Sequence, residues 1–294
     1  MKSVTAKDNK GNNSSGIFYV MYVLSMLLFG TNGYLVSHIS LQSSQIVLVR
    51  TLIGGILLSA MILLQNDFTF SRIKPELRNL LASGIALGLN WVALFAAYRM
   101  LNVSLATLIY YAGPMLVLLF SPWLFREALT KRKLTAIIIV AVGLLCITGS
   151  IAAGKLSMAG LVTAVGSALF YAALIVFNKR IKNTGGLQTA AIELDVAFVV
   201  VLLYVLFTSG FSYPLATDIP YLLTIGLLNT GLAYFLYFSS MQRLPAQSVA
   251  LISYIDPVSA LLFSAMLLNE NMTLLQIAGA VFIIGGAILG ELGD

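Results

Sequence analysis

Long apolar runs separated by short polar stretches dominate this chain. Most of the runs approach the roughly 20 residues that an α-helix needs to cross a hydrocarbon core of about 30 Å. No segment alternates apolar and polar positions in the way that marks a membrane β-barrel. The pattern therefore predicts an all-α integral membrane protein with ten transmembrane helices. The ten runs lie close to residues 16–38, 42–64, 76–98, 102–124, 132–150, 157–179, 186–208, 218–241, 245–268 and 272–290.

Composition supports a chain that is solvated mostly by lipid. Apolar residues make up 59% of it, charged residues only 10%, and the mean hydropathy is +0.95. A soluble domain carries about a quarter charged residues. Residues 1–15 are polar and unpatterned and are predicted to form a cytoplasmic tail. The run after them is too long for a removable signal peptide and has no small-residue cleavage site, so it is expected to stay as the first helix.

The Lys and Arg residues fall almost entirely on one side of the predicted helices. With a cytoplasmic N-terminus the split is about fourteen inside to two outside, which follows the positive-inside rule and leaves both termini in the cytoplasm. The net charge of +6 is thus a signal of topology, and no nucleic-acid partner is expected. The inner set is Lys2, Lys7, Lys10, Arg72, Lys74, Arg78, Arg126, Lys131, Arg132, Lys133, Lys179, Arg180, Lys182 and Arg243, and the outer set is Arg99 and Lys155.

The chain also overlays itself without a gap when it is shifted by 143 positions. Residues 88–143 and 231–286 share about sixteen identities in about fifty-six positions, where apolar composition alone would give roughly five. Five helices fit in residues 16–150 and five in residues 157–290, so the second repeat must start from the opposite face of the membrane. Inverted repeats of this kind supply two conformations of similar energy, which alternating access needs. A transporter is therefore favoured over a channel or a scaffold.

Four ionisable residues fall at bilayer depth, where inserting each charged side chain costs about 2.5 to 3.5 kcal/mol. Such residues are therefore candidates for a functional or structural role. Asp256 lies near the midplane, and the following Pro257 disrupts the preceding turn and frees backbone carbonyls. In the other repeat, the turn that corresponds to Asp256-Pro257 has Gly113 before Pro114, so it has the proline break without the charge. Asp256 is predicted to bind a cationic substrate or a coupling proton; the alternative is a carboxylate tied to a polar neighbour for packing.

The other three embedded charges are candidates for coupling or for an ion pair. Glu193 and Asp195 are about 200° apart around their helix, so one is expected to face the bundle interior and the other to reach toward the inner interface. Arg50 is expected to form a structural ion pair, with a substrate carboxylate as the alternative partner. The four charges together favour a cation, a zwitterion or protons over an anion.

Aromatic and amide side chains are predicted to gather at the same depth, where they could hold an organic cation over ring faces. Tyr111 and Tyr254 are the leading candidates, because each stands three residues before its proline. Each member taken singly also fits packing. The set is Asn32, Asn90, Trp91, Tyr110, Tyr111, Phe170, Tyr171, Asn229, Tyr234, Tyr237 and Tyr254.

The whole pattern resembles the drug/metabolite transporter superfamily, and within it the ten-helix EamA-type carriers. The resemblance rests on Tyr111 and Pro114 leading to residues 125–130, on their copies Tyr254 and Pro257 leading to residues 268–273, and on an arginine in the second helix. It implies a central substrate cavity and gates at the helix ends. The cavity residues would be Asn90, Trp91, Tyr110, Tyr111, Phe170, Tyr171, Asn229, Tyr254 and Asp256, and the gate or helix-end residues Glu127, Glu270, Pro114 and Pro257.

These observations predict a secondary transporter of the plasma membrane that moves a small cationic or zwitterionic metabolite by alternating access. Export is favoured over import, and proton coupling through Asp256 is a hypothesis. The alternatives are a facilitative exchanger or uniporter of a neutral metabolite or nucleobase, and then a channel or scaffold. No catalytic constellation is visible, and the single Cys146 and single His38 argue against a metal site, so neither an enzyme nor a cofactor is expected. A monomer and a homodimer both stay open.

Overall fold

The computed structural model describes residues 5–65, 70–101, 103–148, 157–208, 210–268 and 271–292, and these residues form helices and no strand. The α-helices are α1 (Thr5–Gly30), α2 (Asn32–Ser37), α3 (Ser43–Gln65), α4 (Phe70–Ile73), α5 (Leu77–Met100), α6 (Val103–Tyr110), α7 (Ala112–Phe125), α8 (Lys131–Thr148), α9 (Met158–Asn178), α10 (Gly186–Thr208), α11 (Ile219–Gly226), α12 (Ala233–Met241), α13 (Ala246–Ile252), α14 (Ile255–Leu267) and α15 (Leu274–Glu291). Two short 3₁₀ helices, η1 (Lys74–Glu76) and η2 (Ala216–Asp218), and one π-helix, η3 (Leu227–Leu232), lie between them.

The predicted spans agree with the helices over most of the chain. Nine segments of the described residues are long and apolar enough to cross a membrane, and each coincides with a predicted run. The all-α membrane class is therefore confirmed. The remaining run, residues 132–150, corresponds to α8, which starts with three cations and so has a shorter apolar stretch. Ten spanning helices remain a prediction.

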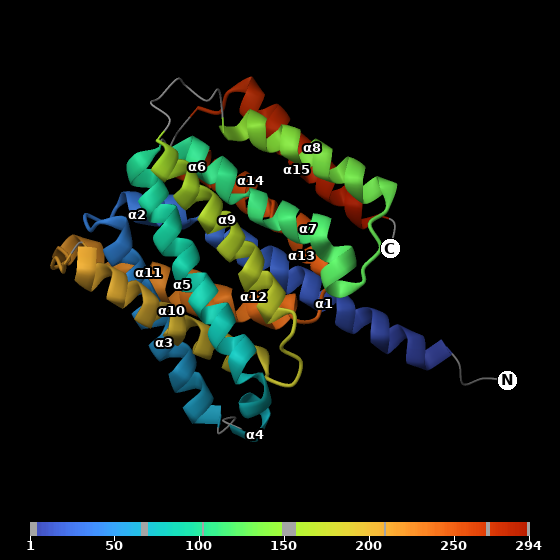
Figure 1. The fold of residues 1–294 in the computed structure, drawn as a ribbon, viewed down its shortest axis with the longest axis horizontal. Coiled ribbons are helices and arrows are strands. Elements are labelled where there is room, and N and C mark those ends of the chain that lie inside the picture. The colour runs from blue at the N-terminus through green and yellow to red at the C-terminus, as the bar shows by residue number, and fades with distance from the viewer. Residues whose placement is uncertain are drawn as a thin grey trace.

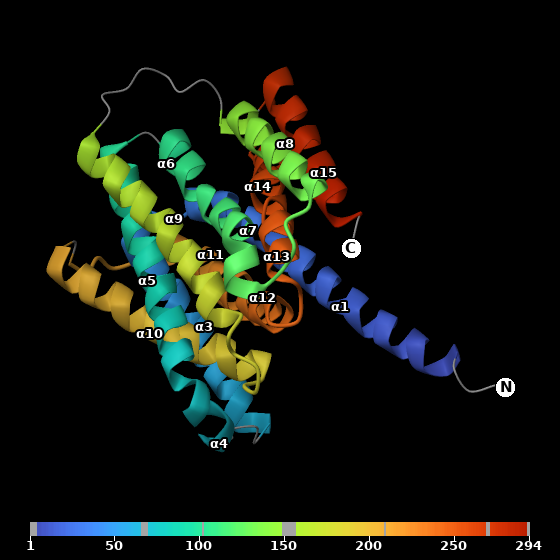
Figure 2. The same ribbon diagram turned by 45° about the vertical axis from the view of Figure 1, so that its right-hand side comes forward.

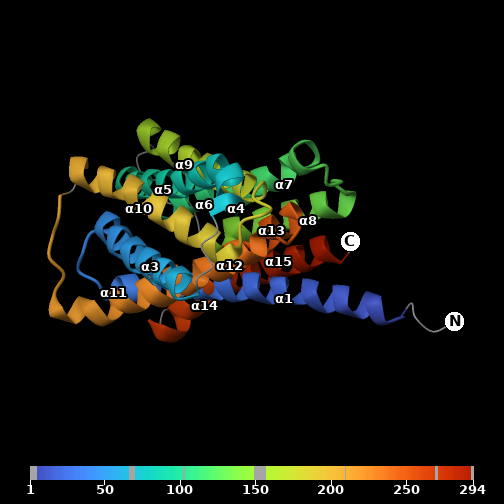
Figure 3. The same cartoon turned by 90° about the horizontal axis from the view of Figure 1, so that it is seen from below.

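The first helix begins earlier than the sequence indicated. Residues 1–15 were expected to be an unpatterned tail, but α1 starts at Thr5 and projects from the bundle toward the N-terminus (Figures 1 and 3). Once a helix has nucleated, each further residue adds one backbone hydrogen bond, so a polar segment can extend an apolar helix. The side of the membrane on which this extension lies remains a prediction.

Helices α8 and α15 pack along each other at one edge of the bundle (Figures 1 and 2). Their backbones touch at two glycines. A Cβ added at Gly143 would lie 2.7 Å from the Gly279 carbonyl oxygen, and one at Gly279 would lie 2.6 Å from that of Gly143. Gly84 and Gly88 on α5 likewise allow close packing, because a Cβ at either position would lie within 3 Å of a valine side chain of α10.

Replacing Gly143 by Leu should separate α8 from α15, because the obstructing atoms are backbone and cannot rotate away. Overpacking of this kind costs about 1 to 3 kcal/mol, so we expect a clearly lower melting temperature in detergent. Gly285→Leu on α15 is the matched control, since nothing lies within 4 Å of a Cβ added there. Equal melting temperatures for the two variants would show that this helix contact contributes little.

Two helices are broken at positions 143 residues apart, as the two prolines predicted. The helix pair α6 and α7 is interrupted at Tyr111, and the pair α13 and α14 at Ser253 and Tyr254. Pro257 cannot donate to the Ser253 carbonyl, which instead accepts from the Asp256 amide at 3.2 Å. The Tyr111 carbonyl accepts from the Tyr254 hydroxyl at 2.8 Å. The two breaks thus lie against each other, and the Tyr254 hydroxyl forms the hydrogen bond that joins them.

A third break was not predicted. The first apolar run divides at Thr31, between α1 and α2. The Asn229 side-chain amide, on the π-helix η3, donates to the Leu28 carbonyl at 2.6 Å and to the Thr31 hydroxyl at 2.7 Å. A polar group from a distant helix therefore satisfies the backbone that this break exposes.

The ends of the bundle form two faces. The Glu127 face is the end at which α7 and α12 finish and α13 begins, and the Gln42 face is the end at which α2 and α5 finish and α3 begins. On the Gln42 face, Asp218 accepts from the Ser40 hydroxyl at 2.6 Å and from the Leu215 amide at 3.0 Å. This pair joins the α2–α3 connection to the start of α11.

Candidate functional site

A central cavity of about 440 Å³ lies between the helices, within the range of about 300 to 1,000 Å³ that is usual for small-molecule pockets. Helices α1 to α3, α5, α6, α9, α12 and α14 contribute to its lining, together with Tyr111 at the break between α6 and α7. Most of the predicted cavity residues come together here, although they lie far apart in the sequence. Those that line it are Asn90, Trp91, Tyr110, Tyr111, Tyr171 and Asp256, and Arg50, which was expected to form an ion pair, lines it as well.

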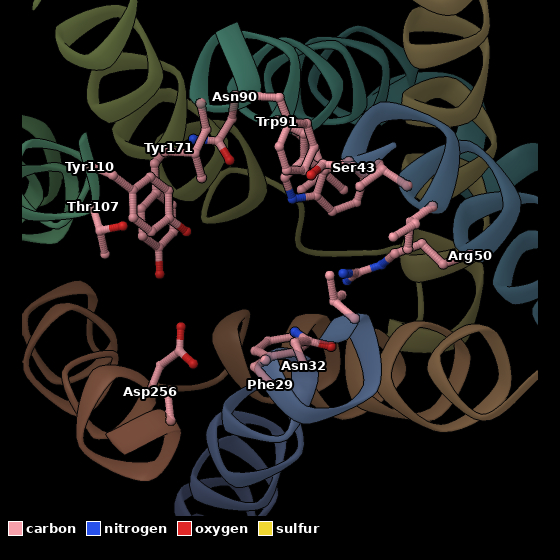
Figure 4. Close-up of a pocket in the computed structure, with 18 of the residues that line it drawn as sticks. Phe29, Asn32, Ser43, Arg50, Asn90, Trp91, Thr107, Tyr110, Tyr171 and Asp256 are labelled. Atoms are coloured by element: carbon pink, nitrogen blue, oxygen red, sulfur yellow. The ribbon is translucent and has the colours of Figure 1, made fainter. Parts of the chain in front are cut away.

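Asp256 occupies one side of the cavity. Its Oδ2 atom accepts from the Tyr111 hydroxyl at 3.1 Å, and Oδ1 has no hydrogen-bond partner among the described residues. Tyr110 and Tyr171 are stacked nearby, with ring centroids 5.1 Å apart and planes at 9° (Figure 4). The break before Pro257 sets the carboxylate at this point. A carboxylate with a free oxygen beside ring faces can bind an organic cation.

Arg50 lies on the opposite side of the cavity (Figure 4). Its Nε donates to the Thr230 hydroxyl at 2.9 Å, and its guanidinium carbon is 5.4 Å from the centroid of the Trp91 ring. None of the acidic residues that the structure describes forms a salt bridge with it. The expected ion pair stays a prediction; in the described structure a threonine and a tryptophan contact the guanidinium.

More aromatic rings fill the space around the cavity. Tyr234 meets Trp91 edge-on at a centroid distance of 5.7 Å, and Tyr237 stacks on Tyr22 at 5.3 Å. Asn90 uses its amide to bind the Ser167 carbonyl at 2.8 Å, which ties α5 to α9. The described residues bring no three His, Cys, Asp or Glu side chains together as a metal site would require.

Three predicted cavity residues lie outside the lining. Phe170 is half-buried and adjacent to Tyr171, so the helical turn of about 100° per residue directs it elsewhere. Tyr254 is 1% exposed and donates to the Tyr111 carbonyl. Asn229 binds the break between α1 and α2. Tyr254 and Asn229 thus support the shape of the site without facing the cavity.

Glu193 and Asp195 also lie outside the cavity lining, although both were candidates for coupling. They do point to different surroundings, as their spacing predicted. Glu193 is fully buried and its Oε1 accepts from the Asn178 amide at 3.0 Å. Asp195 is exposed at the edge of the bundle and accepts from the Ser59 hydroxyl at 3.2 Å.

Glu193 and Asn178 leave two buried oxygens without a donor. Glu193 Oε2 and Asn178 Oδ1 have no hydrogen-bond partner in the described structure, and the nearby Ser83 hydroxyl donates to the Leu174 carbonyl instead. A glutamine at position 193 could donate to Asn178 Oδ1 and still accept from its amide. We therefore expect Glu193→Gln to keep the melting temperature, whereas Glu193→Leu should cost about 1 to 3 kcal/mol. Thermal denaturation of both variants in detergent measures this, and equal losses would show that the pair needs a carboxylate.

The Glu127 face is closed by hydrogen bonds between the two halves of the chain and within the second half. Glu127 accepts from the Ala246 amide at 2.7 Å and from the Gln247 amide at 2.9 Å, so it caps the start of α13. The Gln247 side chain donates to the Ser121 hydroxyl at 2.6 Å. Lys179 donates to the Met241 and Leu244 carbonyls. This network, which we call the Glu127 lock, holds α7 and α9 against α12 and α13.

Burial lowers the pKa of Lys179, and the nearby Glu127 carboxylate partly offsets that shift. The two charges therefore belong to one network. Glu270, the predicted counterpart of Glu127, lies outside the described residues.

On the other side, the central cavity continues toward the Gln42 face. Ser43, Phe95 and Tyr98 line it, and they also line a second cavity that includes Gln42 and Arg99. The second cavity has a volume of about 560 Å³. The described molecule is thus hollow toward the Gln42 face and closed at the Glu127 face.

Sequence reasoning missed two buried contacts, one at the cavity and one that supports the bundle. Thr230, which holds Arg50, lies within an apolar helix, and its only sequence signal is the polar pair Asn229-Thr230 before a glycine. Glu76 accepts from the backbone amides of Lys182 and Thr184 at 2.6 and 2.8 Å, and so ties η1 to the α9–α10 connection. No local pattern identifies that contact, because its partners are more than a hundred residues away.

The model of the EamA-like transporter family matches residues 14–149 and residues 158–290. The uncharacterized transporter YxxF of Bacillus subtilis is 28% identical over 92% of this chain and 88% of its own. A protein of Salmonella typhimurium named "probable amino-acid metabolite efflux pump" is 27% identical over 77% of this chain and 80% of its own. The inner membrane transporter YicL of the same organism is 24% identical over 95% of this chain and 96% of its own.

The fold also occurs among solved structures. One crystal structure superposes with a TM-score of 0.81 and covers 94% of this chain and 97% of its own, at 20% identity. At that identity the likeness concerns the arrangement of the helices alone.

Proposed function

Because this chain belongs to the EamA-like transporter family and is a multi-pass transporter of the plasma membrane, we propose that it exports a small metabolite bearing a protonated amine. Transport would proceed by alternating access through the central cavity. A facilitative exchanger that does not use protons is the alternative that the experiments below address.

One observation carries the choice of substrate: a carboxylate with a free oxygen lines the cavity. Tyr111 occupies Oδ2 of Asp256 and leaves Oδ1 for a ligand. The stacked rings of Tyr110 and Tyr171 add faces on which a cation is attracted by the ring quadrupole. A protonated amine satisfies both the charge and the hydrogen-bonding capacity of this side of the cavity.

The distribution of cations supports a cytoplasmic Glu127 face. Arg126, Lys179 and Arg243 lie at helix ends on that face, together with most other Lys and Arg residues, whereas Arg99 lies at the Gln42 face. In this orientation the cavity opens outward and the Glu127 lock closes the cytoplasmic side. The name of the Salmonella typhimurium relative, an efflux pump, supports export as the direction.

The repeat supports a mechanism in which the two halves exchange conformations. We assign residues 16–150 and 157–290 to inverted repeats, in line with the two matches of one family model and with the breaks at Tyr111 and Tyr254. Opening the Glu127 face would then require α7 to leave α13, while the opposite face closes around the cavity. Nearly equal energies of the two states let modest binding energies shift the balance.

Asp256 also offers a simple route to proton coupling. The same carboxylate cannot hold a proton and an organic cation together. A proton that enters from outside would release the amine outward, and loss of that proton to the cytoplasm would allow the next amine to bind. Each inward proton is then exchanged for one outward substrate.

The function is tested by counterflow in liposomes that contain the purified protein. Phenylalanine and phenethylamine are suitable probes, because both carry an amine and an aromatic ring. Saturable uptake of the labelled probe against an unlabelled internal pool is the expected result, and an imposed pH gradient should drive accumulation. Counterflow without any response to the gradient would identify an exchanger, and no counterflow with either probe would contradict the proposal.

A further inference from the structure

Two charged side chains, Asp256 and Arg50, line the central cavity, and the proposed function uses one of them. Arg50 is 7% exposed and lies in the apolar interior of the bundle. A buried cation at this depth is costly unless an anion or several hydrogen bonds compensate it. Its described polar partner is the neutral hydroxyl of Thr230. Asp256 carries the opposite charge on the other side of the cavity but forms no salt bridge with Arg50, so the guanidinium has no contacting counter-ion among the described side chains of the site.

The contacts of Arg50 leave one edge of its guanidinium free. Nε is occupied by Thr230, and the Trp91 ring lies beside the group at 5.4 Å. The two terminal nitrogens, Nη1 and Nη2, have no hydrogen-bond partner in the described chain and point into the cavity (Figure 4). These two nitrogens present parallel N–H groups, which match the two oxygens of a carboxylate.

The position of Thr230 is set by the π-helix. Its hydroxyl donates to the Ile225 carbonyl, five residues earlier, at 2.8 Å. Because the hydroxyl proton is used there, the oxygen is left to accept from Arg50 Nε. A Cβ at Gly54 would lie 2.8 Å from Thr230 Cγ2, so α3 can approach η3 this closely only with glycine at that position. An irregular helix and a close contact thus fix the direction of the guanidinium.

We infer that Arg50 is a specificity-determining residue that binds the carboxylate of the transported substrate through Nη1 and Nη2. The inference rests on the proposed function, because it assumes that the amine of the same substrate meets Asp256 across the cavity (Figure 4). A substrate with both groups satisfies both charges of the site. An amine without a carboxylate leaves Arg50 uncompensated, so Arg50 sets the preference between the two classes.

Three probes with the same ring and chain length test this assignment: phenylalanine, phenethylamine and 3-phenylpropionate. The last two lack the carboxylate and the amine, respectively. Binding is measured on the purified full-length protein by competition in the liposome counterflow assay. The wild type should prefer phenylalanine to both analogues. Arg50→Gln should weaken phenylalanine binding about ten- to a hundredfold, as expected for loss of a charge-assisted pair of hydrogen bonds, without weakening phenethylamine binding.

Two further variants separate recognition from folding. Arg50→Lys keeps the charge without the two parallel N–H groups and should lose part of the preference. Thr230→Val removes the acceptor for Nε at nearly constant volume and should have a similar, smaller effect. If Arg50→Gln keeps the wild-type ratio of phenylalanine to phenethylamine, the assignment is overturned while the proposed function stands. If the wild type handles none of the probes, both fail.

Discussion

Replacing Asp256 by Asn should abolish transport of amine-bearing probes driven by a pH gradient. The substitution keeps the shape of the side chain and its acceptor for the Tyr111 hydroxyl, but it removes the charge and the exchangeable proton. Loss of a charged partner in a desolvated site corresponds to about ten- to a hundredfold weaker binding. Uptake of labelled phenethylamine into liposomes, with and without a pH gradient, measures both effects.

Two variants show whether the charge is responsible. Asp256→Glu retains a carboxylate and should keep measurable transport, whereas Tyr111→Phe removes one hydrogen bond and should change affinity by less than Asp256→Asn. All three proteins must elute as folded monodisperse peaks in detergent. Wild-type accumulation by Asp256→Asn would rule out this residue as the site of amine binding and coupling.

Cross-linking the Glu127 face should stop transport reversibly. Ala128 and Pro245 are exposed and flank the contact of Glu127 with Ala246. We expect a short, reducible cross-linker between cysteines at positions 128 and 245 to lower counterflow by at least about tenfold, because alternating access requires α7 and α13 to part. Adding a reductant should restore the activity.

This experiment starts from Cys146→Ser, which removes the single native thiol. Each single-cysteine variant, treated with the same reagent, controls for simple modification. A fully cross-linked protein that still transports at the wild-type rate would show that this face need not open. Glu127→Gln gives an independent measure, since weaker capping of α13 should increase labelling of cysteines that face the closed side.

The periodic features of the chain identified the membrane class and most of the spans, because a helix that crosses lipid must be apolar over a fixed length. The same reasoning located the breaks at Tyr111 and Tyr254, since proline removes a backbone donor wherever it stands. It was less informative for α8, where three cations at the start shorten the apolar stretch, and for the division at Thr31, which a side chain from η3 satisfies.

The pairing of distant side chains was beyond these local rules. Arg50, Glu193 and Asp256 were all predicted as functional candidates because each places a charge within the membrane. In the structure Asp256 and Arg50 line the cavity, whereas Glu193 is buried against Asn178. Tyr111 and Tyr254 look equivalent in the repeat, but the hydroxyl of one meets Asp256 and that of the other meets a backbone carbonyl. Neighbouring residues on a helix point about 100° apart, so the direction of each side chain depends on how its helix is rotated in the bundle.

Hydropathy identified a helical membrane chain, because lipid imposes that constraint along each span, and the 143-residue overlay and the positions of Lys and Arg predicted its duplication and orientation. The relation between Arg50 and Thr230 depended on packing, since it requires a π-helix, a glycine at position 54 and residues 180 positions apart. Contacts between helices form when whole helix surfaces pack together, and the local sequence of one helix does not specify which other helix it packs against.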